Sequence, residues 1–115
     1  MDRRLQLKKR LADFARARKW EKYHTPKNLA MAMVKEAAEV VEIFQWLTPA
    51  QAAKLPPAER EHLADELADT FIYLSKIADA YGVDLVEAAL AKMDKNERKY
   101  PAALNQGRIV KRRAS

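Results

Sequence analysis

Cysteine is absent from the 115 residues of this chain, which excludes disulfide bonds and thiol chemistry and gives no sign of an oxidising compartment. No apolar run approaches the length needed to span a membrane, and the first 20 residues are too charged for a signal peptide. We therefore expect a soluble, cytoplasmic protein.

Glycine is almost as scarce, with two residues, while Ala, Leu, Glu and Lys dominate and hydrophobic residues make up 49% of the chain. This balance is typical of an all-helical protein, and no segment has the pattern of a strand. The length suits one domain with room for a core.

The net charge of +6 is unevenly distributed along the chain. Residues 1–20 carry eight Lys or Arg and two Asp, whereas residues 101–115 carry four Lys or Arg and no acid. The stretch between them is acidic. The simplest interpretation is a solvated helix face and a basic tail. Nucleic-acid binding is disfavoured, because no aromatic side chains alternate with the basic ones and no docking motif is present.

Hydrophobic spacing predicts an antiparallel bundle of four main helices. Thr25 followed by Pro26 is typical of a helix start, and Gly82 suits the left-handed residue that follows a helix. Asp84 with Glu87 marks another helix start. The predicted helices cover about residues 3–20, 26–47, 58–81 and 85–98, with a loop or short helical turn between 48 and 57.

The domain organisation follows from these elements. We expect residues 1–101 to form a single all-α domain and residues 102–115 to form a basic, flexible tail. The second predicted helix places one apolar stripe toward the core, formed by Leu29, Met33, Val40, Phe44 and Leu47. The third does the same with Leu63, Leu67, Phe71, Leu74 and Ala78.

Two pairs of acidic residues, each spaced three residues apart, lie inside these helices. Glu36 and Glu39 fall in KEAAEVVEIFQWL, and Glu66 and Asp69 fall in LADELADTFIYL. Residues three apart share a helix face, so antiparallel packing brings four carboxylates to one site. A hard cation such as Mg²⁺, Mn²⁺ or Ca²⁺ is the simplest way to reconcile them, because unpartnered carboxylates protonate or destabilise the fold. The alternative is pairing with Lys or Arg across the bundle or a dimer interface.

The pattern ExxE…ExxD formed by these acids resembles the metal-binding signature of the MazG-like all-α nucleotide pyrophosphohydrolases. The segments KWEKYHTPKNLAMAMVKEAAEVVEIFQWL, DELADTFIYL and KMDKNERKYP resemble the dCTP pyrophosphatase branch of that family. The resemblance covers about residues 14–101, and the last segment makes it far more specific than the carboxylates alone. One departure is Lys35, where the family often has glycine, and we expect this side chain to point away from the metal.

The resemblance implies hydrolysis of a nucleoside triphosphate, most simply dCTP or a modified dCTP, to the monophosphate and pyrophosphate. Such an activity removes unwanted nucleotides from the cellular pool. Mg²⁺ is the implied cofactor, with Mn²⁺ as an alternative. The implied ligands, which are also the implied catalytic residues, are Glu36, Glu39, Glu66 and Asp69. Metal ions held by carboxylates suit this chemistry, because they neutralise phosphate oxygens and align a water.

Further residues are implied to bind the nucleotide. Trp20, Trp46 and Tyr73 would line the base pocket, and Asn96 has the donors and acceptor to read a cytosine edge. The other candidates are His24 and Asn28 near the second helix start, and Lys92, Arg98, Lys99 and Tyr100 near the end of the fourth helix, where cations would meet the triphosphate. Each also has a simpler interpretation, as a core aromatic, a helix cap or a solvated helix end.

A second acidic motif, Glu59-x-x-His62, resembles half of a di-iron site. Such sites need a second copy on a partner helix, and the sequence has none. We therefore assign this motif no function.

Apolar residues extend beyond one face of the second predicted helix, at Ala30, Met31, Ala37, Ala38 and Val41. Four helices from one chain are too few to cover them, so we expect an oligomer. The resemblance implies a homotetramer built as a dimer of dimers, in which a second subunit contributes to the base pocket.

Two alternatives stay open at this point. One is the same chemistry on a different base. The other is a non-catalytic helical interaction module whose acids form salt bridges and whose basic ends contact nucleic acid.

Overall fold

The computed structural model describes residues 2–112, and these residues are helical with no strand. The contacts divide the chain into two compact units, residues 1–82 and residues 83 onward, which are described separately. The first unit contains α1 (Arg3–Ala17), a 3-10 turn η1 (Glu21–Tyr23), α2 (Pro26–Phe44), α3 (Pro49–Ala52) and α4 (Pro57–Ala80). The second contains α5 (Leu85–Lys99) and a 3-10 turn η2 (Ala102–Leu104). The all-α prediction is confirmed. No helix within residues 2–112 is both long and apolar enough to cross a membrane.

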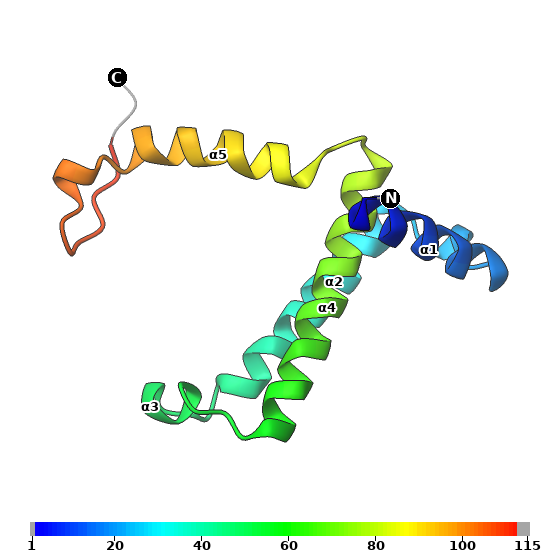
Figure 1. The fold of residues 1–115 in the computed structure, drawn as a ribbon, viewed down its shortest axis with the longest axis horizontal. Coiled ribbons are helices and arrows are strands. Elements are labelled where there is room, and N and C mark those ends of the chain that lie inside the picture. The colour runs from blue at the N-terminus through cyan, green and yellow to red at the C-terminus, as the bar shows by residue number, and fades with distance from the viewer. Residues whose placement is uncertain (1, 113–115) are drawn as a thin grey trace. The chain divides into compact units, whose positions relative to one another are not determined.

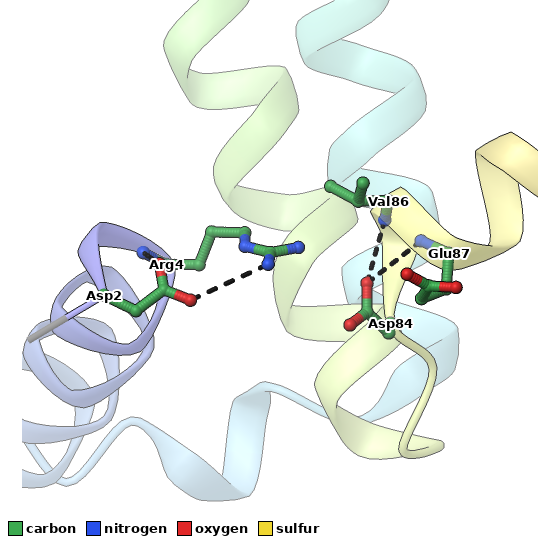
Figure 2. A network of polar contacts seen from close by, with 5 residues as sticks. All are labelled: Asp2, Arg4, Asp84, Val86 and Glu87. Atoms are coloured by element: carbon green, nitrogen blue, oxygen red, sulfur yellow. Dashed lines mark hydrogen bonds and ion pairs between the residues drawn. The ribbon is translucent and has the colours of Figure 1, made fainter.

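The first helix begins at a side-chain cap and ends earlier than the sequence predicted. A carboxylate oxygen of Asp2 accepts the Arg4 N–H at 3.0 Å, and the two side chains also form an ion pair at 3.7 Å (Figure 2). The helix stops at Ala17, because Lys19 adopts a left-handed conformation with φ 55°. The Trp20 N–H then donates to the Ala15 carbonyl at 2.9 Å, which closes a Schellman-type end.

The helices α2 and α4 lie side by side and run in opposite directions (Figure 1). Thr25 caps α2 by accepting the Asn28 N–H at 3.3 Å, and Pro26 follows at the first helical position, as predicted. The helix ends at Phe44 rather than near Leu47.

The connection between α2 and α4 contains the short helix α3, which confirms the predicted helical turn. Thr48 and Gln51 start it with a capping box: the Thr48 hydroxyl accepts the Gln51 N–H at 3.2 Å, and the Gln51 side chain accepts the Thr48 N–H at 2.9 Å. This short connection explains why two consecutive long helices pack antiparallel.

Burial on α4 differs from the expected stripe. Its half-buried positions include the acidic and polar side chains Glu66, Thr70 and Tyr73. Leu67, Phe71 and Leu74, which were expected in the core, are 51%, 49% and 38% exposed. That prediction is wrong for these three residues, because α4 packs on α2 with the face that carries Glu66. An apolar stripe is left uncovered by the chain itself.

The second unit begins after Gly82, whose φ of 65° confirms the left-handed residue predicted after α4. Asp84 caps α5, as predicted, by accepting the N–H groups of Val86 and Glu87 at 3.0 and 3.1 Å (Figure 2). Beyond α5, the side chain of Asn105, a residue of the segment predicted to be a flexible tail, donates to the Pro101 carbonyl at 2.7 Å. The division into one domain and a tail stays a prediction, and residues 113–115 of that tail lie outside the described part.

Candidate metal and nucleotide site

Three of the four acids predicted as ligands gather at the packing face of the α2–α4 pair. Glu36 and Glu39 lie one turn apart on α2, and Glu66 lies on the half-buried face of α4. One carboxylate oxygen from each lies within 4.8 Å of the others. We call these three residues the glutamate cluster. The i, i+3 spacing on α2 and the antiparallel hairpin together produce it.

The cluster is poorly compensated within the chain. The Oε2 atoms of Glu36 and Glu66 are buried and have no hydrogen-bond partner. Among residues 2–112, no Lys or Arg side chain forms an ion pair with a cluster carboxylate. The salt-bridge alternative is therefore not realised among the residues that the structure describes. Buried carboxylate oxygens without partners are costly, so their presence calls for a cation or a proton.

Mutual repulsion and hydrogen bonding perturb the cluster's titration. A shared hydrogen bond with Glu39, followed by burial and the neighbouring negative charges, raises the pKa of Glu66 to about 7. Burial, then hydrogen bonding to Glu39, raises the pKa of Glu36 as well. Hydrogen bonds from the protonated partners, first Glu66, lower the pKa of Glu39. Without a metal ion, the three glutamates thus favour sharing a proton, which takes the place of a cation in reducing their negative charge.

Asp69, the fourth predicted ligand, does not join the cluster. Asp69 is exposed on α4. Its negative charge nevertheless helps to raise the pKa of Glu36, so it acts on the site through space. Lys35, the departure from the family pattern, is exposed on α2, and its positive charge helps to lower the pKa of Glu39.

The donor set of the cluster suits a hard divalent cation. It offers only carboxylate oxygens, and two of them are buried and free of other partners. Mg²⁺ and Mn²⁺ prefer such oxygens and keep coordination positions open for water and phosphate. The role of the four acids as ligands stays a prediction.

The aromatic candidates of the first unit occupy different environments. The Trp20 ring lies edge-on to Phe14, with centroids 5.8 Å apart, and to His24 at 6.2 Å. Tyr73 is half-buried on the face of α4 that also carries Glu66, whereas Trp46 is 86% exposed after α2. Tyr73 is thus the aromatic candidate that shares a helix face with a cluster carboxylate.

His24 and Asn28 belong to the entry into α2. The His24 Nδ1 atom is buried without a hydrogen-bond partner, and burial, then the charge of Lys76, lowers the pKa of this imidazole. Asn28 donates its side-chain amide to the Tyr23 carbonyl at 3.0 Å, in addition to the N–H that Thr25 caps. The local bonds of Asn28 match the simpler interpretation given above, a residue that serves the helix start.

The remaining candidates belong to the second unit. Lys92, Asn96 and Lys99 follow helical spacing along one side of α5. Asn96 and Lys99 are half-buried, and the Lys99 ammonium lies 5.6 Å from the centroid of the Tyr100 ring. Arg98 is in the last turn of the helix. Their part in nucleotide binding stays a prediction.

Sequence reasoning missed one residue beside the cluster. The His62 Nε2 atom lies 3.4 Å from Glu66 Oε1, one turn away on α4. The spacing of four residues between them was a usable signal, but His62 was considered only as part of a di-iron motif.

Comparison with known proteins gives relatives of one kind. dCTP pyrophosphatase 1 of Mus musculus is 42% identical over 102 residues, which cover 87% of this chain and 60% of that protein. The Homo sapiens protein of the same name is 46% identical over 95 residues, which cover 81% of this chain and 56% of the relative. The chain therefore spans less than two-thirds of the length of these relatives.

A solved structure agrees with the fold. The crystal structure of a pyrophosphatase from Archaeoglobus fulgidus has a TM-score of 0.82 and 39% sequence identity, and the match covers 88% of this chain and 94% of that one. The family described as MazG-like matches residues 31–110, which include the glutamate cluster and all of α5. The chain belongs to the MazG-like family.

Proposed function

We propose that this protein is a nucleoside triphosphate pyrophosphohydrolase that cleaves dCTP, or a modified dCTP, to the monophosphate and pyrophosphate. Mg²⁺ is the proposed cofactor, with Mn²⁺ as a substitute. The names of the Mus musculus and Homo sapiens relatives support the reaction and the base. The pyrophosphatase from Archaeoglobus fulgidus, which this chain matches over nearly its whole length, supports the reaction class.

The observation that carries the proposal is the glutamate cluster with its two buried, unpartnered oxygens on adjacent helices. A polyphosphate brings several negative charges, and an anionic cluster would repel it without a cation. When bound, a divalent metal ion neutralises phosphate oxygens and orients a water for attack. The sequence predicts Glu36, Glu39, Glu66 and Asp69 as the residues that hold it.

The chain's own residues divide the remaining work in this proposal. The cluster glutamates would hold the ion, and one of them would polarise the attacking water. Tyr73 extends from the same face of α4 as Glu66, where its ring can stack on the base. Asn96 reads the base edge, and the cations of α5 balance the triphosphate charge.

The proposed assembly is a homotetramer formed as a dimer of dimers. Among residues 2–112, only three hydrophobic residues are buried: Ala15, Leu29 and Ala78. Large apolar side chains on both long helices are exposed, with Met31 and Val41 of α2 at 63% and 61%. Burial of such surface between copies of the chain is the ordinary way to stabilise a small helical protein.

A panel of nucleoside triphosphates tests the proposed reaction. The purified protein is incubated with Mg²⁺ and each triphosphate, and the products are separated by anion exchange. The expected products are dCMP and pyrophosphate, with dCTP or a modified dCTP preferred and no turnover in EDTA. Release of the nucleoside diphosphate and inorganic phosphate would contradict the reaction class. The same products from another base would correct only the specificity, and no turnover together with a salt-sensitive complex with DNA or RNA would favour the interaction module.

A further inference from the structure

His62 lies beside the glutamate cluster but is not part of it. Its imidazole Nε2 is 3.4 Å from Glu66 Oε1, and its side chain is 55% exposed, whereas that of Glu66 is only 12% exposed. The group of oxygens that lie within 4.8 Å of one another contains the three glutamates and no histidine nitrogen. His62 thus approaches the cluster from its solvent side, through Glu66.

The contact distinguishes the two oxygens of the Glu66 carboxylate. Oε1 faces the imidazole, while Oε2 is buried and has no hydrogen-bond partner. The terminal torsion of a glutamate is broad and nearly two-fold, so without a donor the two oxygens interchange easily. The imidazole contact at Oε1 limits this rotation and leaves Oε2 available on the buried side.

The contact between His62 and Glu66 joins two side chains of the same helix, four residues apart. As an ordinary surface pair on one helix, His62 and Glu66 would contribute only marginally to folding. The importance of the pair therefore lies in what it does to the carboxylate orientation.

We propose that His62 is a positioning residue for the metal centre, holding Glu66 Oε1 so that Oε2 is presented to the cation. The inference rests on the proposed function, because it assumes that the cluster holds a divalent ion. Outer partners that orient ligating carboxylates commonly change metal affinity by about 10-fold to 100-fold when they are removed. His62 has the geometry of such a partner.

Three substitutions of His62 separate its effect on the orientation of the Glu66 carboxylate from the effect of side-chain bulk. His62→Leu removes the donor. His62→Gln restores a donor, because the amide nitrogen of glutamine stands as many bonds from Cα as the imidazole Nε2. His62→Asn places its amide nitrogen one bond nearer to the backbone, where Nδ1 stands in histidine. Arg60→Gln is the matched control, since Arg60 is exposed on the same helix and forms no ion pair within residues 2–112.

The measurement is Mn²⁺ binding to the full-length variants, followed by the loss of the free-ion EPR signal in the absence of nucleotide. Helical content by circular dichroism is recorded alongside. We expect His62→Leu and His62→Asn to weaken Mn²⁺ binding by about 10-fold, His62→Gln to recover most of the affinity, and Arg60→Gln to resemble the wild type.

Failure of the role of His62 can be distinguished from failure of the proposed metal centre. Wild-type Mn²⁺ affinity in folded His62→Leu would overturn the role of His62 while leaving the metal centre intact. Equal losses in the Leu and Gln variants would overturn it too, since a donor at the right place would not rescue. If the wild type itself binds no Mn²⁺, the metal centre fails, and the role of His62 fails with it.

Discussion

Glu36 on α2 and Glu66 on α4 each keep one buried carboxylate oxygen, Oε2, that has no hydrogen-bond partner. Both residues belong to the cluster in which oxygens from three glutamates lie within 4.8 Å of one another. Two helices of one chain thus bring negative groups together, and no Lys or Arg between residues 2 and 112 forms an ion pair with them.

Removal of a predicted ligand should abolish turnover without unfolding the chain. We expect Glu36→Gln to lower kcat for dCTP by at least about 100-fold, because the neutral amide weakens the hold on the cation. Asp69→Asn should have an effect of the same order, although Asp69 lies outside the cluster. Asp65→Asn is the matched control, since Asp65 is an exposed aspartate on the same helix. Near wild-type rates in the first two variants would remove them from the mechanism.

The metal-free protein should lose stability as the pH rises through the titration range of Glu66. Its pKa is raised in the fold from an ordinary value of 4.5 to about 7, so folding favours the protonated carboxyl. The resulting stability is complete below about pH 4.5 and lost as the pH approaches and passes 7. The raised pKa of Glu36 also makes the stability fall as the pH rises. The lowered pKa of Glu39 makes the stability fall as the solution becomes more acidic.

Thermal unfolding in EDTA across this pH range measures the effect. Added Mg²⁺ should restore the melting temperature most strongly above pH 7, because the ion then replaces the proton. In Glu66→Gln the decline with pH should flatten, and the response to Mg²⁺ should shrink. A wild-type melting temperature that rises steadily from pH 5 to 8 in EDTA would contradict the assigned sign.

The two tryptophans should separate binding from stability. Trp46 is 86% exposed, so Trp46→Ala should leave helical content unchanged and raise the KM for dCTP by about 10-fold, the effect of losing one stacked base contact. Trp20 contacts the rings of Phe14 and His24, so Trp20→Ala should lower the melting temperature as well. An unchanged KM in Trp46→Ala would exclude this residue from the base pocket.

The end of α1 offers a stabilising substitution. Lys19 has a φ of 55°, a conformation that glycine adopts without steric cost. Lys19→Gly should therefore raise the free energy of unfolding by about 0.5–1 kcal/mol, measured by urea denaturation. Lys19→Ala serves as the control, because alanine retains the strain. A destabilised glycine variant would show that this helix end does not persist in solution.

The tetramer is testable on the exposed apolar surface. Val41→Asp on α2 or Phe71→Asp on α4 should reduce the mass in light scattering from about four times 13.2 kDa to that of a smaller species. Both residues are exposed within the chain, so the helices themselves should persist. A wild-type protein that is monomeric at micromolar concentration would remove the proposed assembly.

Features set by neighbouring residues were predictable from the sequence. Thr25 with Pro26, and Asp84 with the N–H groups that follow it, form their caps within one helical turn. Gly82 ends α4 in the same local manner. The i, i+3 pairs of acids also pointed to the cluster, because the short connection allows only antiparallel packing of the two helices.

Features set by packing between helices were harder to foresee. An apolar stripe on α4 looks like a core to any periodicity argument, but α4 packs through Glu66 and Tyr73 and leaves Leu67 and Phe71 exposed. Helix spacing alone could not exclude Asp69 from the cluster. Asp69 lies about one turn from Glu66 on α4, and the packing of the two helices decides whether its carboxylate reaches the others. His62 was overlooked because its relevance depends on the position of Glu66 in the cluster, which is set by the packing of α4 against α2.

Crystallography with Mn²⁺ and a non-hydrolysable dCTP analogue tests the central claim most directly. Data collected at the manganese absorption edge should show an anomalous peak about 2.0–2.3 Å from oxygens of Glu36, Glu39 and Glu66, with the analogue's phosphates on the open side of the ion. A map without such a peak, in which these carboxylates pair with lysine or arginine side chains of a neighbouring subunit, would contradict it.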